Sequence, residues 1–116
     1  SKNQNMDEFV RKAAGIGLPI VVLLITMATT GLAGAAAITT ALAMLGPGGI
    51  IGGIVLLGII GLASDMLAKY GLEALLIAIY KERIKRGESP QKLCQEIFKL
   101  PITGDLKRAL KKAVAC

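Results

Sequence analysis

The sequence has no histidine and no tryptophan, and its 116 residues include only two phenylalanines, two tyrosines and two cysteines. Without histidine, the chain can have neither a histidine-based catalytic triad or general base nor an ordinary structural zinc site. With so few aromatic rings, it lacks the stacking surface that single-stranded nucleic acid requires and the usual aromatic belt of membrane proteins. We therefore expect no enzyme activity, no cofactor, no metal and no nucleic-acid partner.

Cysteine is also scarce, since Cys94 and Cys116 are the only two. Two cysteines are too few for a disulfide framework. Cys116 is the last residue of the sequence, whereas prenylation needs a cysteine fourth from the end. Reversible acylation of either residue is an alternative, and we expect free thiols at both positions.

Charge is missing from one long stretch, residues 13–64, whereas residues 65–116 hold 17 of the 22 charged residues. A soluble protein normally interleaves charged and apolar residues, because each amphipathic helix needs a polar face. The separation predicts that part of the chain meets water and part does not. The net charge of +6 permits an anionic partner, and we favour anionic lipid because no nucleic-acid-reading module is recognisable.

The uncharged stretch predicts two apolar helices, each long enough to cross a bilayer. Residues 18–45 show no polar stripe at helical spacing, and about 20 residues suffice for a span. Pro19 could kink this helix or mark the first turn of a new one, and "TTGLAG" at 29–34 could bend it or divide it in two. A polar helix that begins near Met6 precedes it. The second apolar helix is expected at about 50–69.

The sequence "GPGG" at 46–49 predicts a tight reversal between these two helices, because a glycine suits a helix C-cap and a proline cannot continue a helix. The following glycines form two overlapping pairs spaced four residues apart, which in lipid lets helix backbones approach closely. The alternative is that glycine is simply frequent in membrane helices. The residues predicted to form the turn and the helix packing are Gly46, Pro47, Gly48, Gly49, Gly52 and Gly53.

The remaining chain has the apolar spacing of three short amphipathic helices. The first begins at Leu72 and stops at Gly87, and the pair at 89–90 supplies an N-cap and a first turn for the second. Pro101 ends the second helix, and the third begins at about Asp105. In the second helix, one side is expected to carry Leu93, Ile97 and Phe98.

Basic residues at the end of the first helix and on the third are predicted to lie on anionic lipid headgroups. The alternative is a solvated face whose opposite apolar stripe packs on the rest of the domain. The predicted membrane-surface residues are Lys81, Arg83, Lys85, Arg86, Lys107, Arg108, Lys111 and Lys112.

Three stretches, "ITTALAMLGPGGIIGG" (38–53), "KYGLEAL" (69–75) and "PITGDLKRAL" (101–110), resemble a recurring pattern in small uncharacterised bacterial proteins. The resemblance covers roughly residues 30–112. It implies a bacterial origin and one unit that includes both the apolar and the polar half, and it implies no activity. In composition alone, the chain is also similar to hairpin holins and circular bacteriocins.

These observations predict one all-α domain over residues 1–116: a polar segment at 1–12, an apolar helical hairpin at 13–69, and basic amphipathic helices at 70–116. The predicted function is that of a small membrane-embedded protein that forms homo-oligomers and permeabilises or remodels a membrane, such as a toxin, a defence effector or a holin-like pore-former. The alternative is a soluble or peripheral helical interaction module whose apolar hairpin is buried in its own bundle or homo-oligomer.

The charge bias also predicts an orientation. Residues 65–116 carry 11 Lys and Arg against 6 Asp and Glu, and the segment before residue 13 carries 3 against 2. Basic segments remain on the cytoplasmic side of a membrane. We therefore expect a bacterial inner-membrane protein with both termini in the cytoplasm and the turn at 46–49 outside.

Overall fold

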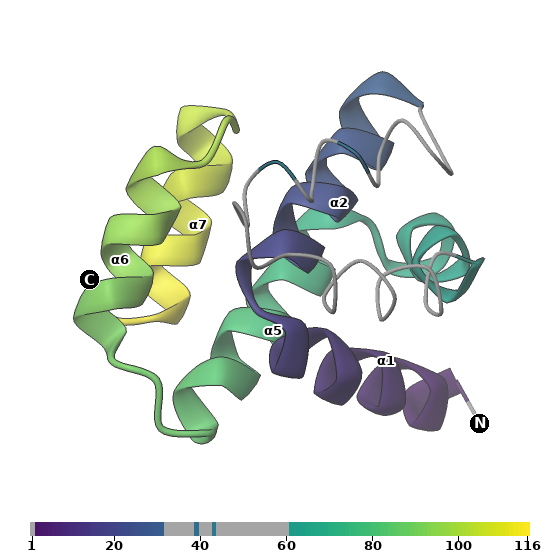
Figure 1. The fold of residues 1–116 in the computed structure, drawn as a ribbon, viewed down its shortest axis with the longest axis horizontal. Coiled ribbons are helices and arrows are strands. Elements are labelled where there is room, and N and C mark those ends of the chain that lie inside the picture. Colours follow the sequence, from purple (N-terminus) through teal and green to yellow (C-terminus); the bar gives the residue numbers. More distant parts are fainter. Residues whose placement is uncertain (1, 32–38, 40–42, 44–60) are drawn as a thin grey trace.

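The computed structural model describes residues 2–31, 39, 43 and 61–116. Within these residues the chain is all-α, as predicted, and contains no strand. The predicted turn at 46–49 lies outside the described residues. The helices are α1 (Lys2–Ile16), α2 (Leu18–Thr30), a helical segment at 61–70, α5 (Leu72–Lys85), α6 (Pro90–Lys99) and α7 (Gly104–Ala113) (Figure 1).

Two glycines set the bounds of α2. Gly17 has a φ of 85° and separates α1 from α2, which are bent by 119° at this break. Pro19 lies in the first turn of α2, so it opens a new helix and does not kink an existing one. At the other end, Gly31 adopts the left-handed conformation of a helix C-cap, and its N–H donates to the carbonyl of Met27. The "TTGLAG" stretch therefore ends this helix, and 18–45 is not one continuous helix.

The helix α2 lies inside the bundle (Figure 1). Its side chains are buried on most of its circumference, and α1 and α5 both contact it. The helices α1 and α5 therefore cover much of this apolar helix. The fully buried core residues include Phe9 and Ala13 of α1, Ile20, Leu23 and Leu24 of α2, and Leu75, Leu76 and Ile79 of α5.

The hydroxyl groups of α2 are satisfied within the helix itself. Thr26 and Thr29 each donate a 2.8 Å hydrogen bond to the carbonyl four residues earlier, that of Val22 and Ile25 respectively. Thr30 makes the same bond to the carbonyl of Thr26. The bonds of Thr26 and Thr29 need no partner from another helix, so these two hydroxyls keep their acceptors when the neighbouring helices move away.

The amphipathic helices end and begin largely where the sequence predicted. Gly87, with a φ of 98°, follows α5, and Pro101 follows α6. Thr103 caps α7, because its hydroxyl oxygen accepts a 3.3 Å hydrogen bond from the N–H of Leu106. Ser89 occupies the N-cap position of α6, although its side chain makes no capping hydrogen bond. The first helix differs, since α1 begins at Lys2 and not near Met6.

Candidate functional site

The buried cation of the structure is Arg83, which the sequence had placed on the membrane surface. Its guanidinium comes from the last turn of α5, and the residue is only 5% exposed. The prediction for Arg83 is therefore wrong. The physical reason is that two carboxylates, on Glu88 and Glu96, reach the same guanidinium and compensate its loss of water.

The cluster around Arg83 joins three segments of the chain. The Nε and Nη2 atoms donate to the carboxylate of Glu88 at 2.8 and 3.0 Å, and Nη1 and Nη2 donate to that of Glu96 at 2.7 and 3.0 Å. Tyr80 donates its hydroxyl to the same Glu96 carboxylate, and its ring centroid lies 5.2 Å from Cζ of Arg83. We call Tyr80, Arg83, Glu88 and Glu96 the Arg83 cluster. It links α5 to the following loop and to α6.

The environment of the Arg83 cluster fixes its protonation. Burial, together with the charge of the Glu96 carboxylate that accepts its hydrogen bond, raises the pKa of Tyr80 well above its ordinary value. Burial alone would lower the pKa of Arg83, but the hydrogen bonds and charges of Glu88 and Glu96 outweigh it and raise the pKa. The cluster therefore contains a neutral phenol and a permanent cation at neutral pH. Both groups thus serve as hydrogen-bond donors that join α5 to the following loop and to α6, and this arrangement suits a structural role.

The basic residue that caps the C-terminus of α5 is also engaged within the protein. Arg86 donates through Nη2 to the backbone carbonyl of Arg11 at 2.7 Å, and its Nε lies 3.4 Å from a carboxylate oxygen of Glu82. This contact links the end of α5 to α1. Of the four predicted basic residues at 81–86, Arg83 is buried and Arg86 is engaged although its side chain stays partly exposed. Lys81 and Lys85 lie on the open surface.

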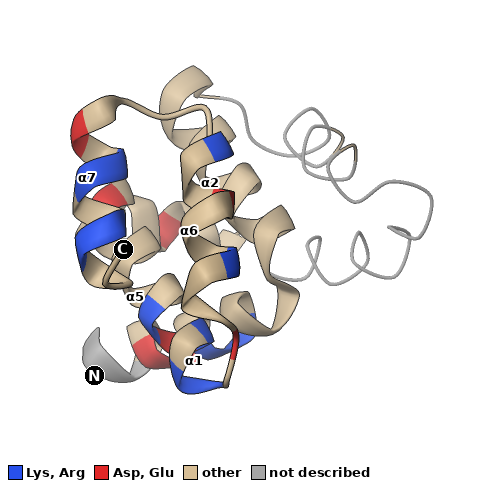
Figure 2. Ribbon diagram, turned by 90° about the vertical axis from the view of Figure 1, so that its left-hand side faces the viewer, with Lys and Arg blue, Asp and Glu red and all other residues tan. Residues whose placement is uncertain are grey.

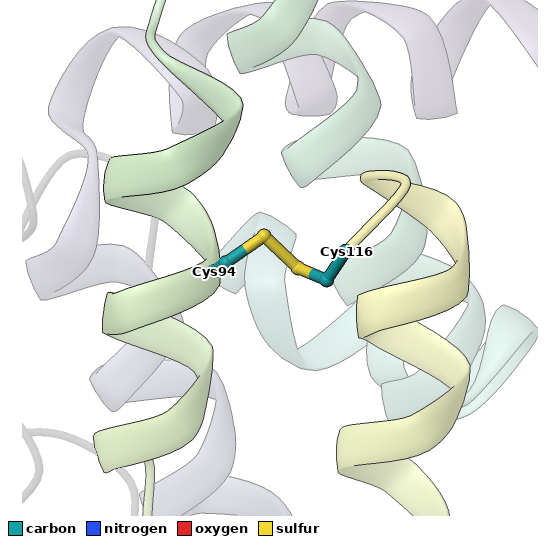
Figure 3. Close-up of a disulfide and its surroundings, with 2 residues drawn as sticks. All are labelled: Cys94 and Cys116. Atoms are coloured by element: carbon teal, nitrogen blue, oxygen red, sulfur yellow. A yellow bond between two sulfur atoms is a disulfide. The ribbon is translucent and has the colours of Figure 1, made fainter.

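The two cysteines are joined, which corrects the expectation of free thiols. Cys94 on α6 and Cys116 after α7 form a disulfide, with their Cα atoms 6.0 Å apart (Figure 3). Cys116 reaches this position because Ala115 has a φ of 60°, and the Cys116 N–H donates to the carbonyl of Lys111 at 2.9 Å. No local sequence signal predicts the pairing, because the two cysteines are 22 positions apart and come together only when α6 and α7 pack.

The outer face of α6 and α7 carries an exposed ring between lysines. Phe98 is 66% exposed, and the Nζ atoms of Lys107 and Lys111 lie 5.5 and 5.4 Å from its ring centroid. Lys107 also donates to the backbone carbonyl of Phe98 at 2.7 Å. Figure 2 shows that basic residues recur along both helices. A hollow of about 420 Å³ beside the ring is lined by Cys94, Gln95, Phe98, Lys99, Lys111 and Cys116.

The position of Phe98 was predicted wrongly. Leu93 and Ile97 are buried, as expected, but Phe98 does not share their face. The reason is that consecutive residues of a helix are rotated by about 100° around its axis, so Phe98 points away from the face that carries Ile97. Phe98 lies instead four residues after Cys94, on the edge of α6 that meets α7.

The other predicted site residues divide into two groups. Arg108 is exposed and pairs with Asp105 on α7, and Lys112 is exposed on the same helix. The structure therefore brings Lys107 and Lys111 together at Phe98 and leaves Arg108 and Lys112 on the adjoining surface. The residues predicted for the turn and the helix packing all lie outside the described residues: Gly46, Pro47, Gly48, Gly49, Gly52 and Gly53.

Comparison with known proteins gives no relative from which a role could be transferred. No protein-family model, no curated protein and no solved structure matches this chain. The candidate site therefore consists of the features described above: the apolar helix α2 within the bundle, the Arg83 cluster, and the basic face of α6 and α7 around Phe98.

Proposed function

We propose that this chain is a small membrane-active helical protein. In this proposal it shelters an apolar helix within its own bundle and delivers it to a lipid bilayer, where copies associate and permeabilise or remodel the membrane. A toxin, a defence effector and a holin-like protein all fit this description. The anionic headgroups of the bilayer are the first partner of the basic helices.

The observation that supports this proposal most is the enclosure of α2. The helix has no charged residue, it belongs to an uncharged run of 52 residues from Ala13 to Ser64, and α1 and α5 cover it. Moving a buried Leu or Ile from a protein core to water costs about 1.5–3 kcal/mol. Moving the same side chain into lipid costs little, because hydrocarbon is as apolar as the core. The helix can therefore leave its bundle for a bilayer but not for water.

The hydroxyl groups of α2 agree with such a transfer. Thr26, Thr29 and Thr30 donate to carbonyls of their own helix, so none of these three bonds is lost when the neighbouring helices separate. An unsatisfied hydroxyl in hydrocarbon would cost several kcal/mol. The internal bonds remove this cost.

Length limits how α2 could enter a bilayer. Among the described helices, none is by itself long and apolar enough to cross a membrane, and only Asn5–Ile16 together with Leu18–Thr30 meets that criterion, as a pair bent by 119°. The proposal therefore requires α2 to lie in the bilayer as part of a broken span or together with the apolar residues that follow it. Self-association rests on the glycine spacing at residues 48–53, which lie outside the described residues.

The alternative function is a helical interaction module with no membrane step. The burial of α2 in its own bundle favours this alternative as well, because it shows that the chain can cover this apolar helix without lipid. The two functions differ in one measurable respect, the environment of α2 when the protein is bound to vesicles.

A single tryptophan can report on that environment, because the native chain has none. We suggest Ala28→Trp on the exposed side of α2 and, as the matched control, Ala74→Trp on the exposed side of α5. With vesicles that contain anionic lipid brominated near the bilayer centre, the proposal expects quenching of the first variant, little quenching of the second, and leakage of a trapped dye. Bound protein with neither tryptophan quenched would reject insertion and support the alternative.

A further inference from the structure

Phe98 has an unusual position among the described residues, since it is the one large apolar side chain that stands exposed. Its neighbours on α6, Leu93 and Ile97, are fully buried. An exposed aromatic ring loses favourable burial unless a partner covers it. Single exposed rings are common on protein surfaces, so the exposure of 66% gains meaning only from the groups that surround the ring.

The groups around the ring specify the charge of that partner. The ammonium groups of Lys107 and Lys111 lie within 5.5 Å of the ring centroid, and Lys99 lines the same hollow. The two carboxylates of α6 and α7 are engaged elsewhere, since Glu96 binds Arg83 and Asp105 pairs with Arg108. Within the part of the chain that the structure describes, no carboxylate pairs with Lys99, Lys107 or Lys111. The ring is thus surrounded by uncompensated positive charge.

The two helices that supply these groups are held in a fixed relation. The disulfide between Cys94 and Cys116 forms one wall of the hollow beside Phe98, and Lys107 bonds to the Phe98 carbonyl. The ring and the ammonium groups are therefore presented together before any partner arrives, which lowers the entropy lost on binding.

We propose that the face formed by Phe98, Lys99, Lys107 and Lys111 is a docking surface for an anionic phospholipid bilayer. The lysines bind the lipid phosphates, and the ring of Phe98 enters the boundary between headgroups and acyl chains. This combination fits a membrane surface, where an apolar layer lies directly beneath a layer of negative charge. A soluble polyanion would match the lysines but would offer no such layer to the ring.

The inference deepens the proposed function, because it names the first contact with the bilayer, yet docking does not require that α2 inserts. Binding and insertion can therefore fail separately. A protein that binds anionic vesicles through this face without quenching of Ala28→Trp would keep the inference and reject the proposed function. A variant that lacks the face, yet binds vesicles as the wild type does and still causes leakage, would keep the proposed function and reject the inference.

The test is co-sedimentation of the intact protein with phosphatidylglycerol-containing vesicles at low ionic strength. The double variant Lys107→Gln/Lys111→Gln should weaken partitioning by roughly 30-fold, which corresponds to about 1 kcal/mol for each lysine at an anionic surface. The control, Lys81→Gln/Lys85→Gln, removes the same charge from exposed positions on α5 and should weaken partitioning much less. Phe98→Ala should weaken it as well, with the net charge unchanged.

Three outcomes would overturn the inference. The first is an equal loss in the two double variants, which would mean that only net charge matters. The second is wild-type partitioning of Phe98→Ala. The third is no binding to vesicles while heparin or RNA binds through the same lysines, which would identify the partner as a soluble polyanion. Circular dichroism of each variant before the assay confirms that the helices are retained.

Discussion

At the scale of single residues, Arg83 shows how the same side chain can belong to a surface or to a core. A charged residue near the end of an amphipathic helix usually lies in water, and its neighbours Lys81 and Lys85 do. Arg83 does not, because Glu88 and Glu96 lie within hydrogen-bonding distance of its guanidinium. The pair with Glu96 is costly to break, because the Glu96 side chain is only 15% exposed and its carboxylate would stay largely desolvated.

We therefore expect Arg83→Met to destabilise the protein by about 2–3 kcal/mol, the usual cost of losing hydrogen bonds to buried charged groups. Methionine keeps much of the side-chain volume, so the loss reports mainly on the charge contacts. The measurement is urea unfolding followed by circular dichroism. Lys85→Met, at an exposed position of the same helix, should change stability by less than about 0.5 kcal/mol. Equal values for the two variants would contradict the structural role of the cluster.

Tyr80 makes the stability of the folded protein depend on pH in the alkaline range. Its pKa is raised in the folded protein, whereas a tyrosine in the unfolded chain ionises near pH 10. The contribution of Tyr80 to the free energy of unfolding is therefore fully present below about pH 10. It is lost as the pH rises further, because the unfolded chain releases a proton that the folded protein retains.

Above pH 10, the free energy of unfolding of the wild type should accordingly fall with pH more steeply than that of Tyr80→Phe. The difference between the two slopes should be up to about 1.4 kcal/mol for each pH unit. Tyr70→Phe, which removes a hydroxyl outside the Arg83 cluster, is the control. The lysines also titrate in this range, so the informative quantity is the difference in slope between variants. Parallel curves for wild type and Tyr80→Phe would show that the phenol does not titrate with unfolding.

At the scale of helices, glycine decides where the apolar segment is divided. Gly31 has a φ of 70° and nothing within 4 Å of the position where a Cβ would lie, so its role is purely conformational. Gly61 also has open space around its Cβ position, but it lies in a helical segment without a positive φ.

The same substitution should therefore have opposite effects at these two glycines. Gly31→Ala is expected to destabilise the protein by about 1 kcal/mol, because alanine is strained in the left-handed conformation. Gly61→Ala should stabilise it by roughly 0.5–1 kcal/mol through a better helix propensity. Thermal unfolding of both variants tests the pair. A stabilised Gly31→Ala would mean that α2 does not end with a left-handed C-cap.

The disulfide is the second constraint at this scale. Crosslinking two cysteines that are 22 residues apart restricts the unfolded chain and contributes about 3 kcal/mol to stability. Cys94→Ser/Cys116→Ser should lose about this amount in urea unfolding, and reduction of the wild type should lose a similar amount. If reduction leaves the unfolding midpoint unchanged, the crosslink does not stabilise α6 and α7.

Sequence patterns predicted where the helices begin and end better than they predicted which side chains are buried. The breaks at Gly87 and Pro101 and the apolar face of α5 at Leu75, Leu76 and Ile79 follow from local chemistry and helical spacing, and the structure confirms them. The burial of α2 and Arg83 depends on which helices meet in space, and no local spacing contains that information. Phe98 shows the remaining limit, since a difference of one position along a helix separates the core from the surface.

At the scale of the molecule, the described part of the uncharged sequence that forms α2 does not stand apart from the charged helices. The amphipathic helix α5 contacts α1, α2 and α7, so it helps to cover α2. In this arrangement, α6 and α7 are the layer farthest from α1 and carry the basic face around Phe98 (Figures 1 and 2). The two features required by the proposed function, a sheltered apolar helix and the face proposed to bind a membrane, thus belong to one bundle.

The disulfide between Cys94 and Cys116 finally bears on where in a cell this form of the protein can exist. Disulfides persist in oxidising compartments, whereas the glutathione and thioredoxin systems of an ordinary cytosol keep thiols reduced. The predicted cytoplasmic C-terminus and an intact disulfide are therefore in chemical conflict. We expect the crosslinked bundle to be the form that meets a membrane from its oxidising side, and the dithiol to be the form present during synthesis. Alkylation of freshly lysed, acid-quenched cells would separate the two forms by mass, and a fully crosslinked cytosolic pool would contradict this assignment.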